Sequence, residues 1–149
     1  MDTFKIENFK AENKDRVFPV YHHLSKLETK IIFDCLSDIF FSSGNRSPIK
    51  LVKIISQSVV YIEAFNASKA EFRLKAVLQH LNIEPDDDVY LNWYRFDDID
   101  QIGTSGLDQY FHDIWYPSSD DIDIFDQHLS WIISIRHDGV LAYWNRHQV

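Results

Sequence analysis

Apolar residues recur at helical spacing in the first half of the chain. The first clear stripe consists of Leu24, Leu27, Ile31, Ile32, Cys35, Leu36, Ile39 and Phe40. Ser25 and Glu28 form the signature of a capping box, which predicts that this helix begins directly after Ser25. The Ser-Ser-Gly-Asn run at 42–45 is predicted to end the helix, because glycine and asparagine favour helix C-termini.

Two further helices are predicted before the middle of the chain. Ser47 followed by Pro48 is a start signal, because serine caps a helix and proline suits its first turn. The β-branched stretch 59–65 is compatible with a strand or a helix, and the unbroken apolar spacing favours one helix over 48–65. A third helix is predicted to begin at Ser68, with Glu71 as its capping partner.

The second half of the chain favours strands. Aromatic and β-branched residues, partly with a two-residue period, predict strands over 89–96, 121–125, 131–136 and 140–144. A short helix is predicted over 105–115. Within 121–125 the two isoleucines point to one side, and Asp121 and Asp123 point to the other.

The last two predicted strands are joined by a hairpin signal. Asp138-Gly139 is a dipeptide that favours tight turns between antiparallel strands. Because side chains alternate between faces, the turn length decides which residues share a face. A two-residue turn at this dipeptide gives one face the residues Trp131, Ile133, Ile135, Ala142 and Trp144.

Helices followed by strands indicate an α+β fold, in which N-terminal helices pack on one face of a C-terminal antiparallel sheet. With 149 residues and 45% hydrophobic content, the chain is predicted to form a single compact domain over 1–149. Residues 1–23 have poor periodicity and contain Pro19, so they are predicted to form an irregular N-terminal arm or a short helix.

The charge along the chain is clustered. The segment 84–126 contains thirteen acids and one base, so its net charge of −12 is more negative than the −8 of the whole chain. Residues 1–83 hold twelve bases and nine acids. Nine aromatic residues lie among the acids, which indicates a folded acidic surface, because disordered tails are poor in such residues. This surface favours a basic protein partner and repels nucleic acid.

Six aspartates and four aromatic side chains are predicted to form the partner-binding surface. The charged members are Asp97, Asp98, Asp100, Asp120, Asp121 and Asp123. The aromatic anchors are Trp93, Tyr94, Trp115 and Tyr116. Aromatic residues surrounded by polar groups are typical of the energetic centre of a protein interface.

Residues suited to catalysis and metal binding offer an alternative. Paired aspartates are oxygen ligands of the kind that Ca²⁺ or Mg²⁺ prefers, but none has EF-hand spacing, and they are interpreted as solvated acids. A small metal-assisted hydrolase is the enzymatic alternative, with a general base from His112, His128 or His137 beside Asp108, Asp113 or Asp126. Zinc-protease, nucleophile-elbow and phosphate-loop motifs are absent from the sequence, so no catalytic residue and no cofactor is predicted.

The sequence also bears on the compartment. The N-terminus does not read as a signal peptide, and no apolar run approaches the length of a membrane span, so a soluble cytoplasmic protein is expected. The single cysteine, Cys35, cannot form an intramolecular disulfide, which fits a reducing compartment. Its place on an apolar helix face predicts a small core residue.

Two C-terminal segments resemble a known class of proteins. Residues 114–126, Ile-Trp-Tyr-Pro-Ser-Ser-Asp-Asp-Ile-Asp-Ile-Phe-Asp, and 131–139, Trp-Ile-Ile-Ser-Ile-Arg-His-Asp-Gly, resemble small acidic bacterial immunity proteins. Such proteins accompany contact-dependent growth inhibition and other polymorphic toxins. The resemblance implies a cytoplasmic, non-catalytic protein that binds a toxin domain, often a basic nuclease, and blocks its active site. An acidic adaptor domain is the remaining non-enzymatic alternative.

Overall fold

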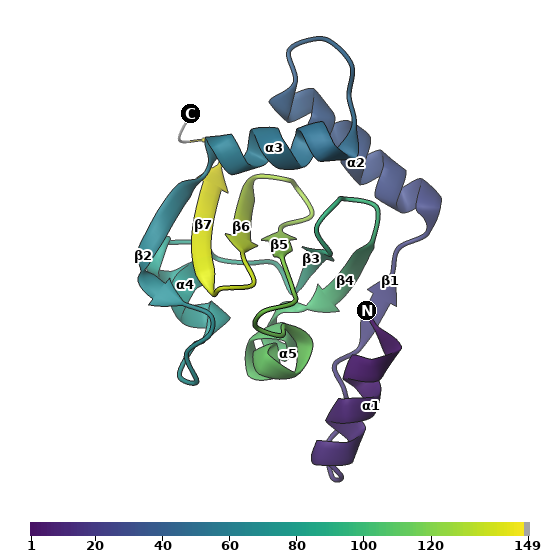
Figure 1. Cartoon of the computed structure of the whole chain (residues 1–149), viewed down its shortest axis with the longest axis vertical. Coiled ribbons are helices and arrows are strands. Elements are labelled where there is room, and N and C mark those ends of the chain that lie inside the picture. The colour runs from purple at the N-terminus through teal and green to yellow at the C-terminus, as the bar shows by residue number, and fades with distance from the viewer. Residues whose placement is uncertain (148–149) are drawn as a thin grey trace.

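The computed structural model describes residues 1–147 and contains a seven-stranded antiparallel sheet with helices on both faces (Figure 1). The strands are β1 Tyr21–His23, β2 Val60–Asn66, β3 Asp88–Asn92, β4 Ile99–Gly103, β5 Ile122–Phe125, β6 Trp131–Ile135 and β7 Val140–Asn145. The helices are α1 Thr3–Glu12, α2 Lys26–Phe40, α3 Pro48–Ser58, α4 Leu74–His80, α5 Thr104–Gln109 and α6 Phe111–Ile114. The strand order is β1-β4-β3-β5-β6-β7-β2. The predicted α+β class is confirmed.

Both early helix starts are where the sequence predicts them. The Ser25 hydroxyl accepts the backbone N–H of Glu28, and the Glu28 carboxylate accepts the N–H of Ser25, so the capping box of α2 is complete. The Ser47 hydroxyl accepts the N–H of Lys50, and Pro48 is the first residue of α3. These local hydrogen bonds explain why the starts can be read from the sequence.

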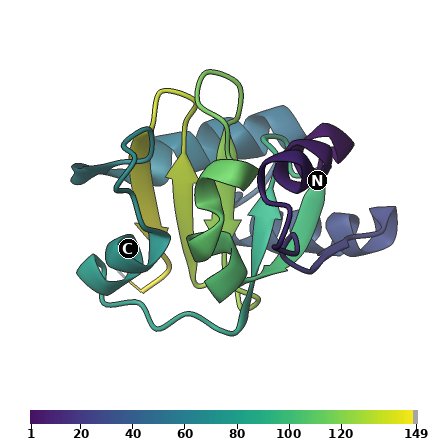
Figure 2. The same cartoon turned by 90° about the horizontal axis from the view of Figure 1, so that it is seen from below.

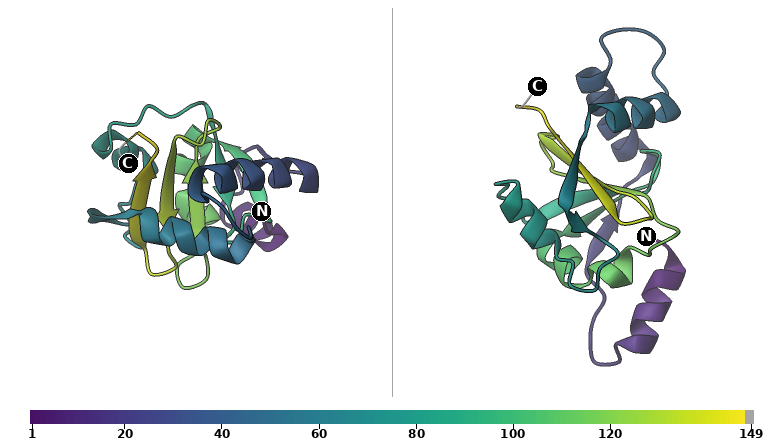
Figure 3. Two further views of the ribbon diagram at one scale, coloured as in Figure 1. Left: turned by 90° about the horizontal axis from the view of Figure 1, so that it is seen from above. Right: turned by 60° about the vertical axis from the view of Figure 1, so that its left-hand side comes forward.

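Helices α2 and α3 cover one face of the sheet (Figure 3). Leu36 of α2 and Ile55 of α3 belong to a buried cluster that includes Ile132 of β6. The predicted apolar stripe is wrong at three exposed positions: Leu27, Ile31 and Cys35. Ile32, Leu36 and Phe40 pack in this cluster, whereas the three exposed positions lie on the side of α2 that is turned away from it.

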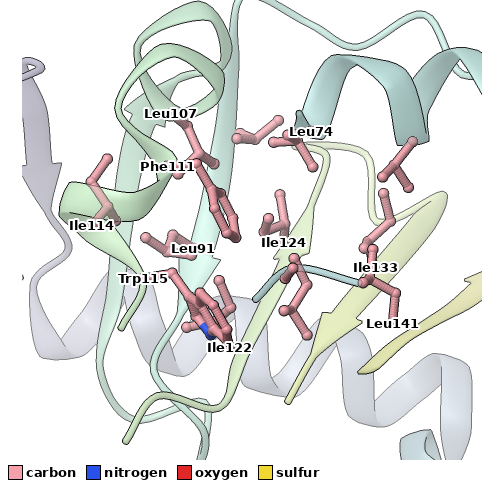
Figure 4. Packing of buried hydrophobic residues seen from close by; sticks show 14 of the residues in the cluster. Leu74, Leu91, Leu107, Phe111, Ile114, Trp115, Ile122, Ile124, Ile133 and Leu141 are labelled. Carbon is pink, nitrogen blue, oxygen red and sulfur yellow. The ribbon is translucent and has the colours of Figure 1, made fainter. Parts of the chain in front are cut away.

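The opposite face of the sheet is covered by α1, α4, α5 and α6 (Figure 2, Figure 3). Phe111 and Trp115 pack there over the strands (Figure 4). The prediction of a sheet covered on one face is therefore wrong. Strand β5 contributes side chains to both faces. Ile122 and Ile124 belong to this cluster, whereas Phe125 belongs to the cluster beneath α2 and α3, so both faces of the strand are apolar and covered.

The predicted helix over 48–65 is wrong in its second half. Helix α3 ends at Ser58, Val59 is extended, and β2 follows as an edge strand of the sheet. Val60 pairs with Tyr143 and Tyr61 pairs with Ala142 of β7. The β-branched residues take the strand conformation because β7, which is distant in sequence, offers backbone pairing partners.

Helix α4 begins at Leu74 rather than at Ser68, and the predicted capping box is not formed. The N–H of Ser68 donates instead to the side chain of Asn66 at 2.9 Å. At the actual helix start, the Asp108 carboxylate accepts the N–H of Lys75 at 2.8 Å. A carboxylate from α5 thus accepts a backbone N–H at the start of α4, which is the role that the local sequence predicted for the hydroxyl of Ser68.

The strand predicted over 89–96 ends early. Strand β3 stops at Asn92, and the chain turns back into β4, for which no element was expected. Tyr94 and Phe96 have φ angles of 78° and 59°, which are incompatible with a strand. The helix predicted over 105–115 is present as α5 and α6, which are interrupted at Tyr110.

The β6–β7 hairpin forms as predicted, but its register differs. The N–H of Arg136 donates to the carbonyl of Val140 at 3.0 Å, so the turn contains three residues, 137–139. Gly139 adopts a positive φ of 83°, which glycine accommodates. One additional turn residue exchanges the faces of β7. The side chains that share a face are therefore Trp131, Ile133, Ile135, Leu141 and Tyr143.

Residues 1–23 contain regular structure, and the short helix is the predicted alternative that is present. The Phe9 side chain of α1 is buried and contacts the rings of Phe18 and Tyr110 edge-on. Strand β1 extends the sheet and places His23 opposite Asp100 of β4. Within residues 1–147, no helix combines the length and the apolar character needed to cross a bilayer.

Candidate binding pocket

A pocket of about 320 Å³ lies between the start of α1, the loop after β3 and the loop before β5. Its lining residues are Met1, Asp2, Trp93, Tyr94, Asp98, Ser119, Asp120 and Asp121. We call it the acidic pocket, because four of its lining residues are aspartates, and the cation among these described lining residues is the amino group of Met1, which is paired with Asp100. The predicted partner-binding residues that it brings together are Trp93, Tyr94, Asp98, Asp120 and Asp121.

The loop after β3 is held in a restrained conformation. Tyr94 and Phe96 occupy the left-handed region, which is unfavourable for aromatic residues. The Asn92 side-chain oxygen accepts the N–H of Phe96 at 2.7 Å, and the N–H of Trp93 donates to the carbonyl of Asp98 at 2.9 Å. These bonds fix the backbone that presents Trp93, Tyr94 and Asp98 to the pocket.

Asp123 is not part of this surface, and its predicted exposure is wrong. The residue is 1% exposed, because β5 lies within the sheet and has covered faces on both sides. Its carboxylate accepts hydrogen bonds from the side chains of Asn92, Ser134 and Arg136. We call this group the buried polar bridge. It supports the pocket indirectly, since Asn92 also holds the loop after β3.

Asp100 is likewise buried, at 0% exposure, and its predicted place on the charged surface is wrong. One carboxylate oxygen accepts the indole N–H of Trp93 at 2.8 Å and the amino group of Met1. The other oxygen lies 2.9 Å from Nδ1 of His23. Asp100 thus orients Trp93 behind the pocket and is already bonded on both oxygens.

Trp115 belongs to the core and cannot be a surface anchor. Its side chain is fully buried and stacks on Phe111 with ring centroids 5.6 Å apart (Figure 4). Its indole N–H donates to the carbonyl of Asp120 at 2.9 Å. The sequence could not separate this residue from Trp93, because both are tryptophans surrounded by acids.

A lysine missed by the sequence analysis lies beside the pocket. Lys5 of α1 is completely buried, donates to the carbonyl of Ile114 at 2.8 Å and pairs with the Asp120 carboxylate. Its ammonium nitrogen lies 4.0 Å from the centre of the Tyr116 ring and 5.1 Å from that of Trp93. Tyr116 and Asp120 therefore bind a cation of the chain itself. No local signal indicates this contact, which joins residues more than a hundred positions apart.

The other predicted acids keep more of their capacity for external contacts. Asp97 is exposed, and the carboxylate of Asp121 accepts from the backbone N–H of the exposed His137 and lies 2.9 Å from its ring nitrogen. Burial raises the pKa of Asp98 above its usual range, opposed by the amino group of Met1 and reinforced by Asp100. Oδ1 of Asp98 is enclosed and has no hydrogen-bond partner within the described residues.

Two of the three histidines of the enzymatic alternative have different neighbours. His137 pairs with Asp121 on the exposed hairpin, and His112 contacts the rings of Phe72 and Phe111. Asp108 and Asp126 are occupied by other donors: Arg73 and Lys75 bond to Asp108, and Ser130 and Trp131 bond to Asp126. His23, which the sequence placed outside any candidate site, lies 2.9 Å from the buried carboxylate of Asp100.

Comparison with models of protein families, with curated proteins and with solved structures gives no match for this chain. The geometry of the acidic pocket is therefore the principal basis for assigning a function.

Proposed function

We propose that the chain is a non-catalytic binding protein that neutralises a basic protein partner. The observation that carries this proposal is the acidic pocket, which four aspartates line together with Trp93 and Tyr94, and in which the amino group of Met1 is already paired with Asp100. We infer that a lysine or arginine side chain of the partner enters it.

The pocket chemistry suits such a side chain in two ways. Carboxylates form charge-assisted hydrogen bonds with ammonium and guanidinium groups, and aromatic faces attract the same cations. Trp93 and Asp120 already contact the buried ammonium of Lys5 while they line the pocket. Tyr94, 43% exposed, adds a further ring to the lining, and the guanidinium of the neighbouring Arg95 already lies 5.6 Å from the centre of this ring. The partner cation would meet the same residue types that hold Lys5.

The most specific form of the proposal is an immunity protein that blocks a toxin nuclease in the cytoplasm. Nucleases bind nucleic-acid phosphates through basic residues, and an acidic protein that covers those residues excludes the substrate. The resemblance of residues 114–126 and 131–139 to immunity proteins supports this form. The first of these segments supplies three pocket residues: Ser119, Asp120 and Asp121.

Charge reversal in the pocket tests the proposal. The protein is co-expressed with the product of the adjacent reading frame, and binding is measured by calorimetry at two salt concentrations. Replacing Asp98 and Asp121 together with lysine is expected to weaken binding at least 100-fold, because both changes place cations opposite the partner's cation. It should also abolish the rescue of growth in cells that express the partner.

A matched double variant controls for net charge. Asp86→Lys with Asp87→Lys changes the charge equally at exposed positions outside the pocket. This variant is expected to bind within about threefold of the unchanged protein, and binding of the unchanged protein should weaken with added salt. Equal losses in both double variants, or no loss in either, would refute the pocket as the binding site.

A further inference from the structure

We propose that His23, Asp98 and Asp100 form a binding site for a divalent transition-metal ion of the Zn²⁺ type. The site lies where β1 meets β4, at the side of the acidic pocket that Asp98 lines. It does not depend on the proposed function, because an ion can bind here whether or not a protein partner enters the pocket.

The three side chains converge through sheet pairing. His23 of β1 stands directly opposite Asp100 of β4, and Asp98 immediately precedes β4. Nδ1 of His23 lies 2.9 Å from Oδ1 of Asp100 and 3.8 Å from Oδ1 of Asp98. One possible ligand atom from each of the three residues lies within 4.8 Å of the other two. Two ligand atoms at about 2.0–2.2 Å from a tetrahedral Zn²⁺ ion are roughly 3.4 Å apart, so each of the two separations has to change by about half an ångström, through rotation of the His23 and Asp98 side chains, when the ion binds.

Asp100 has the features of an oriented metal ligand. It is fully buried, and its Oδ2 is held by the indole of Trp93 and the amino group of Met1, so that Oδ1 is directed toward His23. Such bonds from a second layer of residues set the orientation of a metal ligand and strengthen binding. The Asp100 carboxylate is therefore already oriented for an ion before the ion binds.

Asp98 supplies an independent observation. Its Oδ1 is enclosed by the protein but has no hydrogen-bond partner within the described residues. A buried oxygen without a donor is costly, and a cation at the site would satisfy it. The rest of the Asp98 side chain and the ring of His23 remain about half exposed, which leaves a route for the ion.

The donor set selects the class of ion. One imidazole nitrogen and two carboxylate oxygens suit Zn²⁺, which accepts three protein ligands and an open fourth position. Ca²⁺ and Mg²⁺ prefer oxygen ligands and bind imidazole poorly. The site should therefore distinguish Zn²⁺ from both ions.

Calorimetry on the untagged, chelator-treated protein tests the proposal. Titration with ZnCl₂ is expected to show one saturable site that includes His23, and Zn²⁺ should raise the thermal midpoint. Co²⁺ should produce a visible absorption band of a bound, low-symmetry ion. Ca²⁺ and Mg²⁺ at the same concentration should leave the midpoint unchanged.

Substitutions at and beside the site identify the ligands. His23→Ala and Asp98→Asn are each expected to lower Zn²⁺ affinity at least tenfold and to remove the Co²⁺ band. The neighbouring exposed residues provide matched controls, and His22→Ala and Asp97→Asn should retain both signals. Circular dichroism and the midpoint without metal confirm that each variant is folded.

Two results would overturn the site. Absence of saturable Zn²⁺ binding would show that His23 is only a hydrogen-bonded histidine. Binding that persists in both His23→Ala and Asp98→Asn would place the ion elsewhere on the chain.

Discussion

The buried polar bridge and the acidic pocket use the same residue type for opposite purposes. Asp123 in the bridge is 1% exposed and accepts hydrogen bonds from three other side chains. Asp98 in the pocket has an enclosed oxygen without such a donor, within the part of the chain that the structure describes. Asp123, whose carboxylate is bonded within the chain, stabilises the fold, whereas Asp98 has an oxygen that is available to a ligand.

The two regions are also neighbours in sequence. Asp120 and Asp121 line the pocket, and Asp123 lies two residues further on in β5. The loop before β5 is open to solvent, but the strand itself is covered on both sides by side chains from the two clusters. For Asp121 and Asp123, a position outside or inside β5 therefore decides whether the carboxylate is open to solvent or bonded within the sheet. Four predictions test this division.

The largest effect is expected at the aromatic anchors, which divide in the same way. Trp115→Ala should lower the free energy of unfolding by about 3–5 kcal/mol, because it leaves a large cavity in the core. Tyr94→Ala should cost less than about 1 kcal/mol, since the side chain is 43% exposed. Urea unfolding measures both, and similar losses would contradict the assignment of Trp115 to the core and Tyr94 to the pocket.

The second prediction compares the acids themselves. Asp123→Ala should lower the free energy of unfolding by about 3 kcal/mol, because Arg136 and the polar groups of Asn92 and Ser134 lose their acceptor. Asp121→Ala should cost about 0.5 kcal/mol, because its partner His137 is exposed. Urea titration of the two variants at neutral pH makes the comparison, and an equal cost would show that the bridge does not stabilise the sheet.

The third prediction concerns pH. Burial raises the pKa of Asp98, so the folded protein retains this proton to higher pH, and its contribution to stability falls as pH rises above the unfolded value of about 3.9. For Asp108, burial acts upward, but hydrogen bonds from Arg73 and Lys75 lower the pKa overall. Its contribution is present above about pH 3.9 and is lost as pH falls through the lowered pKa.

Unfolding free energies measured between pH 3 and 6 separate these two acids. Asp98→Asn should remove the part of the free energy of unfolding that decreases as pH rises. Asp108→Asn should remove the part that is lost as pH falls. The same direction of change in both variants would contradict the contrast between Asp98, whose enclosed oxygen has no hydrogen-bond donor among the described residues, and the hydrogen-bonded Asp108.

The smallest effect is expected from the backbone of the pocket loop. Tyr94 has a φ of 78°, which glycine adopts readily and β-branched residues do not. Tyr94→Gly should remain within about 0.5 kcal/mol of the unchanged protein, whereas Tyr94→Val should lose about 1–2 kcal/mol. Thermal unfolding of the two variants and of the unchanged protein under the same conditions measures this difference in stability. Equal values for glycine and valine would show that the loop relaxes to another conformation.

The outcome of the sequence predictions follows the range of the interactions involved. The start of α2 was predicted correctly because Ser25 and Glu28 bond within one turn. The start of α4 was predicted incorrectly, because Asp108, whose carboxylate accepts a backbone N–H at this helix start, lies on another helix. The hairpin was located by Asp138-Gly139, but its register depended on a third turn residue, which the dipeptide signal does not specify.

The candidate site shows the same limit. Sequence alone identified the acidic and aromatic segment, and five of its ten predicted binding residues line one pocket: Trp93, Tyr94, Asp98, Asp120 and Asp121. It also overestimated the surface, since Asp100, Asp123 and Trp115 are buried. Hydrophobic and charged patterns report which residue types occur, but do not report whether a second layer covers them.

By itself, the sequence determined the α+β class, the main helix starts, the hairpin and the concentration of negative charge, because spacing, caps and composition are local properties. Only the tertiary structure decided which acids face outward. Helices on both sides of the sheet buried Asp100 and Asp123, and α1 brought Lys5 to Asp120. The physical reason is that burial and ion pairing depend on contacts between segments far apart in the chain, which no local pattern encodes.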